Sequence, residues 1–219
     1  QDIGGPLARS VEDLALALDA TVGVDPADET TRLSEGHVPD SYTTALNANG
    51  LEGARIGVVV SMLGGENAPV RLVMEAAGVE MEALGATLVE IEEPVLTTLV
   101  EGVSVIGQEF KFNLDAYLQA TPGAHVRSLA DFVNTGLYHS ILERGLQTSL
   151  EVETLDTDDY RERLAKRDEV RAAVVALMDE QMLDALLYPT IRQTARPIGQ
   201  PQPGSNCALS ASLEVPAIT

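Results

Sequence analysis

Cysteine is nearly absent from the sequence: Cys207 is the only one in 219 residues. A single cysteine cannot form an intramolecular disulfide bond, and we therefore expect a protein of the reducing cytoplasm. No apolar run is as long as a membrane span, and no basic segment followed by an apolar one stands at Gln1 as in a secretory signal. These absences predict a protein without a membrane partner.

Basic residues are also scarce, with 14 Lys and Arg against 34 Asp and Glu and a net charge of −20. Proteins bind nucleic acids and anionic membranes through clustered Lys and Arg, so we expect neither partner. The acidity itself is typical of a highly soluble protein. Hydrophobic residues make up 45% of the chain, which is enough for a packed α/β or α-helical globule.

The N-terminal part of the chain predicts a helix followed by a polar excursion. Ser10 and Asp13 form a capping-box pattern, and apolar residues then recur at helical spacing up to Gly23. The stretch 25–53 is polar and rich in Pro, Asn and Gly. It predicts a long surface segment with one helical turn near Tyr42.

A βαβ unit is predicted next. The β-branched run 54–60 and the run TLVEIE at 87–92 predict two strands, and a helix from Pro69 to Gly85 lies between them. Elements of these lengths are typical of a crossover that joins parallel strands. The helix is expected to bury one apolar face, which consists of Val70, Val73, Ala77, Met81 and Leu84.

The C-terminal part of the chain predicts more helices and two short strands. One helix is expected over 95–120 and another over 157–182. Between them, Ser128 is expected to cap a third helix. Short apolar runs predict one strand at 184–189 and the start of another at Val215.

Patterns for catalysis or metal binding are incomplete in this sequence. Gly64 and Gly65 follow a strand but lack the other residues of a phosphate-binding loop, so a flexible loop is expected. His139 and Glu143 are four residues apart without a third ligand, so we expect no metal site. Cys207 lies among small residues, as a buried inert thiol does, and no Gly-x-Ser-x-Gly elbow is present.

Only two lysines, Lys111 and Lys166, are available as bases. A catalytic lysine must be buried enough to lose its proton. Lys166 stands among Arg161, Arg163 and Arg167, which predicts a solvated helix face, whereas Lys111 lies between two phenylalanines. No loop rich in Ser and Gly accompanies either lysine, so the residues by themselves predict no catalytic site.

The opening stretch, QDIGGPLARSVEDLALALDA, resembles the segment after the nucleophile loop of amidase signature enzymes, Q-D-T-x-G-P-M/L-A-R-[ST]-V-x-D-A-A-x-L-L. The match is long and gapless, with Ile3 in place of the usual Thr. Later family segments resemble LEGARIGVVV, MEALGATLVEIEEP, LDALLYPTIRQTARPIG and ALSASLEVPAIT, where Glu214 replaces a usual Gly. The stretches EFKFNLDAYL, RSLADFV and YHS resemble the peptide amidase branch.

This resemblance implies an α/β fold, in which helices surround a mixed β-sheet, and a hydrolase of carboxamide C–N bonds. The family activates a nucleophilic serine through a second serine on a cis peptide and a lysine, and it needs no cofactor. All three residues precede the Q-D-x-x-G-P segment, so the resemblance places no catalytic residue in this chain. Residues 1–219 then form a single incomplete amidase domain, without its N-terminal catalytic part and C-terminal strands.

The resemblance also indicates which residues contact the substrate, a peptide amide or a small amide. Phe110, Tyr138, Thr190 and Asn206 are candidates for the walls of the pocket, and ordinary packing is the alternative role for each. Asp2 is expected to hold the nucleophile loop by hydrogen bonds rather than to take part in the chemistry.

Two other functions stay open at this point. One is the amidase subunit of a tRNA-dependent amidotransferase, which would release ammonia from glutamine and require partner subunits. The other is a non-catalytic α/β binding or scaffold protein. A homo-oligomer is compatible with each of these functions, and the sequence does not decide the oligomeric state.

Residues 1–219 produced alone are expected to be inactive and to unfold without a cooperative transition, because the missing chain leaves a sheet edge and apolar helix faces uncovered. Thermal unfolding followed by circular dichroism, together with the dispersion of NMR signals, measures this. A sharp transition with well-dispersed signals would contradict the expectation.

Overall fold

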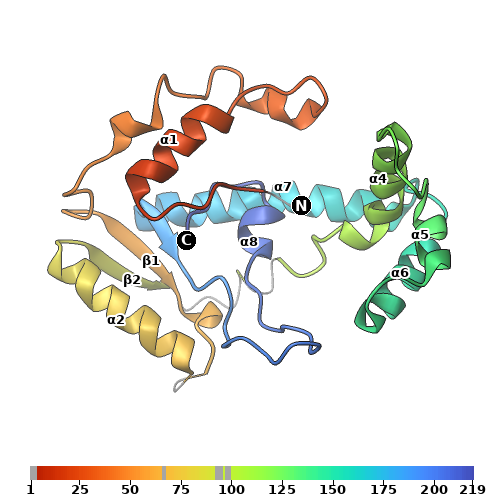
Figure 1. The fold of residues 1–219 in the computed structure, drawn as a ribbon. Coiled ribbons are helices and arrows are strands. Elements are labelled where there is room, and N and C mark those ends of the chain that lie inside the picture. The colour runs from red at the N-terminus through yellow and green to blue at the C-terminus, as the bar shows by residue number, and fades with distance from the viewer. Residues whose placement is uncertain (1–3, 66–67, 92–95, 97–99) are drawn as a thin grey trace. The chain divides into compact units, whose positions relative to one another are not determined.

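The computed structural model describes residues 4–65, 68–91, 96 and 100–219. The chain divides into two compact units, Asp2–Glu52 and Gly53–Thr219. Figure 1 shows the helices of the first unit in red and orange, and it shows the strands of the second unit in orange, yellow and blue. No helix among the described residues is both long and apolar enough to cross a membrane.

Helix α1 (Val11–Thr21) forms in the first unit as the sequence predicts. Ser10 Oγ accepts a hydrogen bond from the Asp13 amide at 3.1 Å, so the predicted N-terminal cap is confirmed. Two short 3₁₀ helices follow, η1 (Glu29–Ser34) and η2 (Tyr42–Ala45). The second is the turn predicted near Tyr42, whereas the sequence does not predict the first.

Asp19 ties η2 to α1. Its carboxylate accepts hydrogen bonds from Ser41 Oγ at 2.6 Å and from the Tyr42 amide at 2.7 Å. The Ser41 hydrogen bond, followed by the Tyr42 hydrogen bond, holds the pKa of Asp19 below its usual value. The long polar segment of the first unit is therefore anchored to its helix by one ionised side chain.

A parallel three-stranded sheet lies in the second unit, in the order β2-β1-β3. Its strands are β1 (Arg55–Val59), β2 (Thr87–Ile91) and β3 (Ala185–Leu187). Arg55 lies opposite Thr87, and Ile56 lies opposite Ala185. These pairings confirm the predicted parallel crossover, the strand near 184–189 and the α/β fold class.

Asp184 anchors β3 to the beginning of β1. Its Oδ2 accepts a hydrogen bond from the Arg55 amide at 2.8 Å, and its own amide donates to the Arg55 carbonyl at 2.8 Å. The Arg55 guanidinium also donates to the Gln181 carbonyl at 3.2 Å. These contacts hold together two segments that are 129 residues apart in the sequence.

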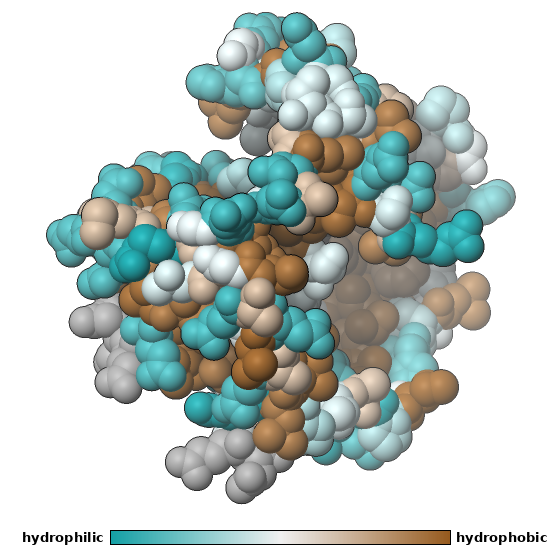
Figure 2. Space-filling view, turned by 90° about the vertical axis from the view of Figure 1, so that its left-hand side faces the viewer, coloured by the Kyte–Doolittle hydropathy of each residue, from teal (hydrophilic) through white to brown (hydrophobic). Residues whose placement is uncertain are grey.

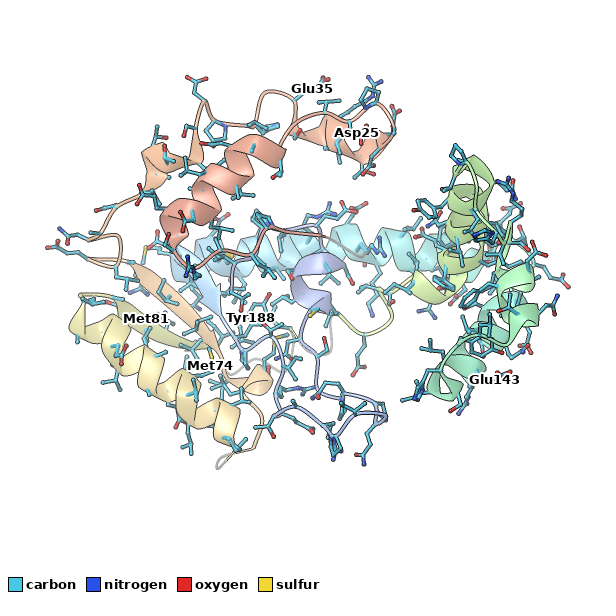
Figure 3. All side chains as sticks on the ribbon, viewed as in Figure 1. Asp25, Glu35, Met74, Met81, Glu143 and Tyr188 are labelled. Carbon is cyan, nitrogen blue, oxygen red and sulfur yellow. The ribbon has the colours of Figure 1, made fainter. Side chains whose placement is uncertain are left out.

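Helix α2 (Pro69–Ala83) covers one face of the sheet, with Pro69 in its first turn as predicted. A Cβ atom on Gly78 would lie only 2.9 Å from Leu88 Cδ1, so α2 approaches β2 closely at this glycine. Met74 lies on the sheet side of the helix (Figure 3).

The outer side of α2 is partly apolar. Val73 and Leu84 are 67% and 63% exposed, although the sequence predicts that both face the sheet. This part of the predicted face is wrong because apolar residues occur all around the helix, so their spacing does not identify the buried side. Apolar side chains also stand among polar ones on the face drawn in Figure 2. Exposed apolar surface of this kind favours association.

The other face of the sheet carries the main hydrophobic core. Helix α7 (Asp158–Gln181) and the short helix α8 (Ala208–Ala211) contribute to it. Gly57 of β1 faces this core, and a Cβ atom there would lie 2.6 Å from Leu183 Cδ1 and 2.9 Å from Leu186 Cδ2. The buried members of the core are Val59, Met62, Ile91, Leu96, Val103, Val170, Val174, Leu183, Leu209 and Leu213.

The segment between β2 and α7 contains α4 (Ile106–Ala120), α5 (Leu129–Thr135) and α6 (Glu143–Leu150). Ser128 Oγ accepts a hydrogen bond from the Asp131 amide at 3.0 Å and caps α5 as predicted. Of the helix predicted over 95–120, Leu96 is helical and α4 covers Ile106–Ala120, whereas 100–105 are not helical and residues 95 and 97–99 lie outside the described residues. Gly102 has a φ of +74°, in the left-handed region that does not continue a helix.

The strand predicted from Val215 is wrong, because residues 215–219 form no strand and 216–219 are exposed. A strand satisfies its backbone hydrogen bonds through a neighbour, and none of the strands described here pairs with this segment. Glu214 adopts a φ of +55°, a conformation that glycine accepts most readily. The usual Gly of the resembling segments therefore corresponds to a real backbone requirement.

The Gly57→Ala variant is expected to lower the free energy of unfolding by about 1–3 kcal/mol, because the new methyl group overpacks against Leu183 and Leu186. Gly145→Ala in α6 is the matched control, since a Cβ atom there meets nothing within 4 Å. The control is expected to be neutral or slightly stabilising, because alanine favours a helix. Chemical denaturation measures both variants, and equal stability would contradict close packing at Gly57.

Candidate functional site

A cavity of about 400 Å³ lies beyond the carboxyl ends of β1 and β3. Open sheets of parallel strands bind their ligands at this end, and the volume suits a small-molecule site. Three separate parts of the chain supply its walls, namely Ser61 and Met62, Val100 and Glu101, and Arg192, Ser205, Asn206 and Ala208. The cavity is the candidate functional site of the second unit.

Another cavity, of about 420 Å³, lies between α2 and the sheet. Its walls include the apolar residues Val58, Met74 and Leu187. Among its charged residues, Arg71 and Glu75 form an ion pair with each other at 2.8 Å, and Glu82 and Glu90 also line it. We favour the cavity at the strand ends, because it combines polar side chains with the position at which parallel sheets bind ligands.

Asn206 is the most deeply buried polar side chain in the cavity wall, at 4% exposure. Its Nδ2 donates to the Met62 carbonyl at 3.1 Å and to the Pro189 carbonyl at 2.7 Å. Its backbone amide donates to the Thr190 carbonyl at 2.9 Å. One side chain therefore joins the segment after β1 to the segment after β3. The donor of this side chain is Nδ2, and its acceptor is Oδ1.

The two ends of the Pro- and Gly-rich loop meet next to Asn206. Ile191 and Ser205 form an antiparallel bridge, and the Arg192 amide donates to the Gly204 carbonyl at 2.9 Å. Gly64 packs against the same segment, with a φ of +87° and a virtual Cβ 3.3 Å from the Arg192 carbonyl oxygen. The positive φ and this close backbone contact explain why a glycine stands at position 64. This agrees with its interpretation as a loop residue.

Ser61, Glu101 and Arg192 give the cavity three kinds of polar group. Ser61 Oγ is buried and has no hydrogen-bond partner in the described part of the chain. Glu101, which carries a carboxylate, and Arg192, which carries a guanidinium, line the same walls. A hydroxyl, a negatively charged hydrogen-bond acceptor and a positively charged hydrogen-bond donor together suit a ligand that both donates and accepts hydrogen bonds.

Of the predicted substrate contacts, the structure brings Thr190 next to Asn206, but only Asn206 is among the described residues that line the cavity. Asn206 lines it, and Thr190 is the exposed residue whose carbonyl accepts from the Asn206 amide. Asp2, the residue expected to hold the nucleophile loop, lies outside the described residues. The roles of all three residues stay predictions.

Phe110 and Tyr138 lie elsewhere, in and between the helices α4 to α6. Phe110 is 37% exposed on α4, and the Tyr138 ring centroid lies 5.7 Å from that of Phe132. The Tyr138 hydroxyl donates to the carboxylate of Glu143, which is labelled in Figure 3. This hydrogen bond raises the pKa of Tyr138 and lowers the pKa of Glu143. Neither aromatic residue is among the described residues that line the cavity.

His139 and Glu143 are both engaged in local structure. His139 Nδ1 accepts from the Ile141 amide at 3.2 Å, and Glu143 accepts from Tyr138 and Gln147. Within the described ranges, no group of three His, Cys, Asp or Glu residues is arranged to hold a metal ion. Cys207 is exposed, so the expectation of a buried thiol is wrong. It precedes α8 at the surface, whereas the small residues after it pack inward.

Both lysines bind backbone carbonyl groups. Lys111 Nζ donates to two carbonyls at the end of α6, at 3.1 and 2.7 Å. Lys166 Nζ donates to the Glu101 carbonyl, and the neighbouring Arg167 is only 8% exposed. The predicted solvated face is confirmed at Arg161, which is exposed, but it is wrong at Lys166 and Arg167, because this side of α7 packs against the segment before α4.

Ser61, Glu101 and Arg192 are cavity residues that the sequence does not identify. Ser61 and Arg192 each follow a predicted strand by a few residues, and that position is the one signal that points to them. Glu101 has no such signal, because it falls within the stretch that the sequence assigns to a helix. Its place in the cavity depends on tertiary contacts.

The Asn206→Leu variant is expected to lower the free energy of unfolding by about 1–3 kcal/mol, because the Met62 and Pro189 carbonyls lose their buried donor. Cys207→Ala is the control, since this exposed neighbour is expected to change stability by less than about 0.5 kcal/mol. Thermal or chemical unfolding compares the two, and wild-type stability of Asn206→Leu would show that the bridge is unimportant.

Comparison with known proteins places this arrangement in a family. The family model described as Amidase matches residues 1–219. A probable amidase of Arabidopsis thaliana is 30% identical over 195 residues, which cover 85% of this chain and 38% of that protein. A glutamyl-tRNA(Gln) amidotransferase subunit of Halorhodospira halophila is 41% identical over 106 residues, which cover 48% of this chain and 21% of that protein.

Solved structures agree with the sequence relatives. The native peptide amidase from Stenotrophomonas maltophilia superposes with a TM-score of 0.79 at 30% identity, over 95% of this chain and 44% of that one. The chain thus spans less than half the length of these relatives. Because the family model extends over all 219 residues and the parallel sheet and helices superpose on a peptide amidase, the chain belongs to the amidase signature family that its opening motif predicts.

Proposed function

We propose that this chain is part of an amidase that hydrolyses carboxamide C–N bonds, and that it supplies structural support and one wall of the substrate pocket. The observation that carries this proposal is the polar cavity at the carboxyl ends of β1 and β3, within a chain that matches the family from end to end. A substrate at this end of the sheet would meet Asn206 and the groups of Ser61, Glu101 and Arg192.

In this proposal the chemistry is carried out by a serine, a second serine on a cis peptide and a lysine, all upstream of Gln1. The serine attacks the carbonyl carbon of the amide, and backbone N–H groups stabilise the negative charge that develops on the carbonyl oxygen. The two lysines of this chain support an upstream base, because both ammonium groups donate to backbone carbonyls. A lysine that acts as a base must instead accept a proton.

A peptide amide or a small amide is the proposed substrate. The structural likeness to a peptide amidase, over nearly the whole chain, supports a peptide. The cavity supports it as well, because a peptide presents alternating N–H and C=O groups that match a hydroxyl, an amide and charged side chains. The wall around Asn206 and Thr190 is the proposed contact in this unit, and Phe110 and Tyr138 are proposed to contact parts of the substrate outside the cavity.

A component of a tRNA-dependent amidotransferase is the second candidate. Its support is the higher identity to proteins of that class, which is confined to about half of the chain. Such a component would release ammonia from glutamine and act with partner subunits. We favour the hydrolase because the likeness to the peptide amidase covers 95% of this chain, whereas the match to the amidotransferase subunit covers 48%. A non-catalytic scaffold is the third candidate.

Several further properties belong to the same proposal. The isolated residues 1–219 are inactive, since the triad is proposed to lie outside them, and no cofactor takes part. The protein acts in the cytoplasm on small-molecule or peptide amides, without nucleic acid or membrane partners. A homo-oligomer is compatible with this activity.

The full-length protein that contains this chain is expected to release ammonia from a C-terminally amidated peptide, and to do so without partner subunits. Ammonia release from the amidated peptide and from glutamine, with the nucleophilic serine replaced by alanine as the control, measures this. Release from glutamine alone, and only with partner subunits, would favour the amidotransferase. No release from any amide would favour the scaffold.

A further inference from the structure

One face of α7 carries three cations that bind consecutive backbone carbonyls. Arg163, Lys166 and Arg167 stand at helical spacing on the same side of α7. Arg163 Nη1 donates to the carbonyls of residues 104 and 102 at 3.2 and 3.5 Å, and Arg167 Nε donates to that of residue 103 at 3.0 Å. Lys166 Nζ donates to the carbonyl of residue 101. We call these three residues the carbonyl clamp.

The clamped segment is also fixed from its other side. Val103 and Val105 are fully buried, and Val103 belongs to the main core. Gly102 turns the chain with its φ of +74°, and a Cβ atom there would lie 3.8 Å from Lys166 Nζ. Val103 holds the segment in the core while the cations hold its carbonyl groups, so the segment has little freedom to move.

The position of this segment connects the clamp to the candidate site. Glu101, the first residue of the segment, lines the cavity together with Val100. Helix α4 begins just after the segment, at Ile106. Lys166 binds the carbonyl of Glu101 itself. Any shift of the Glu101 backbone would therefore move a wall of the cavity.

The three cations of the clamp donate hydrogen bonds to neutral carbonyl groups, although the chain has only 14 Lys and Arg residues. Arg167 is only 8% exposed, and a buried charge needs hydrogen bonds, which its Nε makes with the carbonyl of residue 103, whereas its Nη2 has no partner among the described residues. Arg163 also forms an ion pair with Asp159 at 2.8 Å, and the Asp159 hydrogen bond raises the pKa of Arg163. Hydrogen bonds from charged donors are stronger and shorter than those between neutral groups, so they suit a segment that must be held in one position.

We infer that Lys166 is a positioning residue for substrate binding, and that Arg163 and Arg167 support it. The carbonyl clamp fixes the backbone of Glu101, and this backbone sets the place of the Glu101 and Val100 side chains in the cavity wall. Lys166 does not touch the substrate in this account. The inference rests on the proposed function, because it assigns the cavity to substrate binding.

The kinetic test uses the full-length protein and an amidated peptide. Lys166→Met removes the ammonium group and keeps the length of the side chain. It is expected to raise KM about five- to tenfold with kcat within about twofold of wild type, since the wall contributes to binding before the chemistry. Lys166→Arg keeps a charged donor and is expected to restore KM to within about twofold of wild type.

Arg161→Met is the matched control on the same helix. Arg161 is exposed, and its guanidinium pairs with Asp156 and Asp158 rather than with the clamped segment. The control is expected to leave KM and kcat unchanged. A loss of thermal stability in Lys166→Met with KM unchanged would overturn the inference, because it would reduce Lys166 to a purely structural residue.

Amide hydrogen exchange provides a readout that does not depend on catalysis. Lys166→Met is expected to exchange the amides of residues 100–105 at least about tenfold faster than wild type, whereas Arg161→Met is expected not to. Unchanged exchange in Lys166→Met would overturn the clamp itself. If the wild-type protein hydrolyses no amide, the proposed function fails, and the exchange rates still decide whether the clamp holds the segment.

Discussion

The pairing of β1 with β3 is the constraint on which the second unit depends. It joins Arg55 and Asp184, which are 129 residues apart in the sequence, through hydrogen bonds. The core packs so closely against β1 at Gly57 that no side chain fits there. Because both strands are parallel and end together, the segments after them must meet at one edge. Asn206 then joins those segments through the carbonyls of Met62 and Pro189. The cavity is the direct result of this geometry.

The walls of the cavity are held by polar contacts to backbone groups. Asn206 does this on the side of the strands, and the cations of α7 do it on the side of Glu101. Hydrogen bonds to carbonyl groups fix the course of the chain independently of the side chains that it carries. The side chains of the wall are therefore open to variation while its shape is kept, which suits a family that acts on different amides.

Much of the fold could be predicted from the sequence, because local signals agree with it. Ser10 and Ser128 cap their helices, and the strand near 55 has the β-branched content of a buried parallel strand. The errors fall where tertiary contacts decide. The spacing around α7 indicates a solvated face, yet Arg167 is buried there by the segment that ends at Val105. The site was predictable only near Asn206, because Ser61 and Glu101 come from distant segments without a motif.

We propose that the cavity beyond β1 and β3 is a wall of the substrate pocket. A crystal structure of the full-length protein with a bound peptide inhibitor would show whether the inhibitor lies there. We expect inhibitor atoms within about 4 Å of Asn206 or Glu101, the usual distance of packed atoms. An inhibitor that is bound by the rest of the protein and touches none of the cavity residues would contradict this proposal.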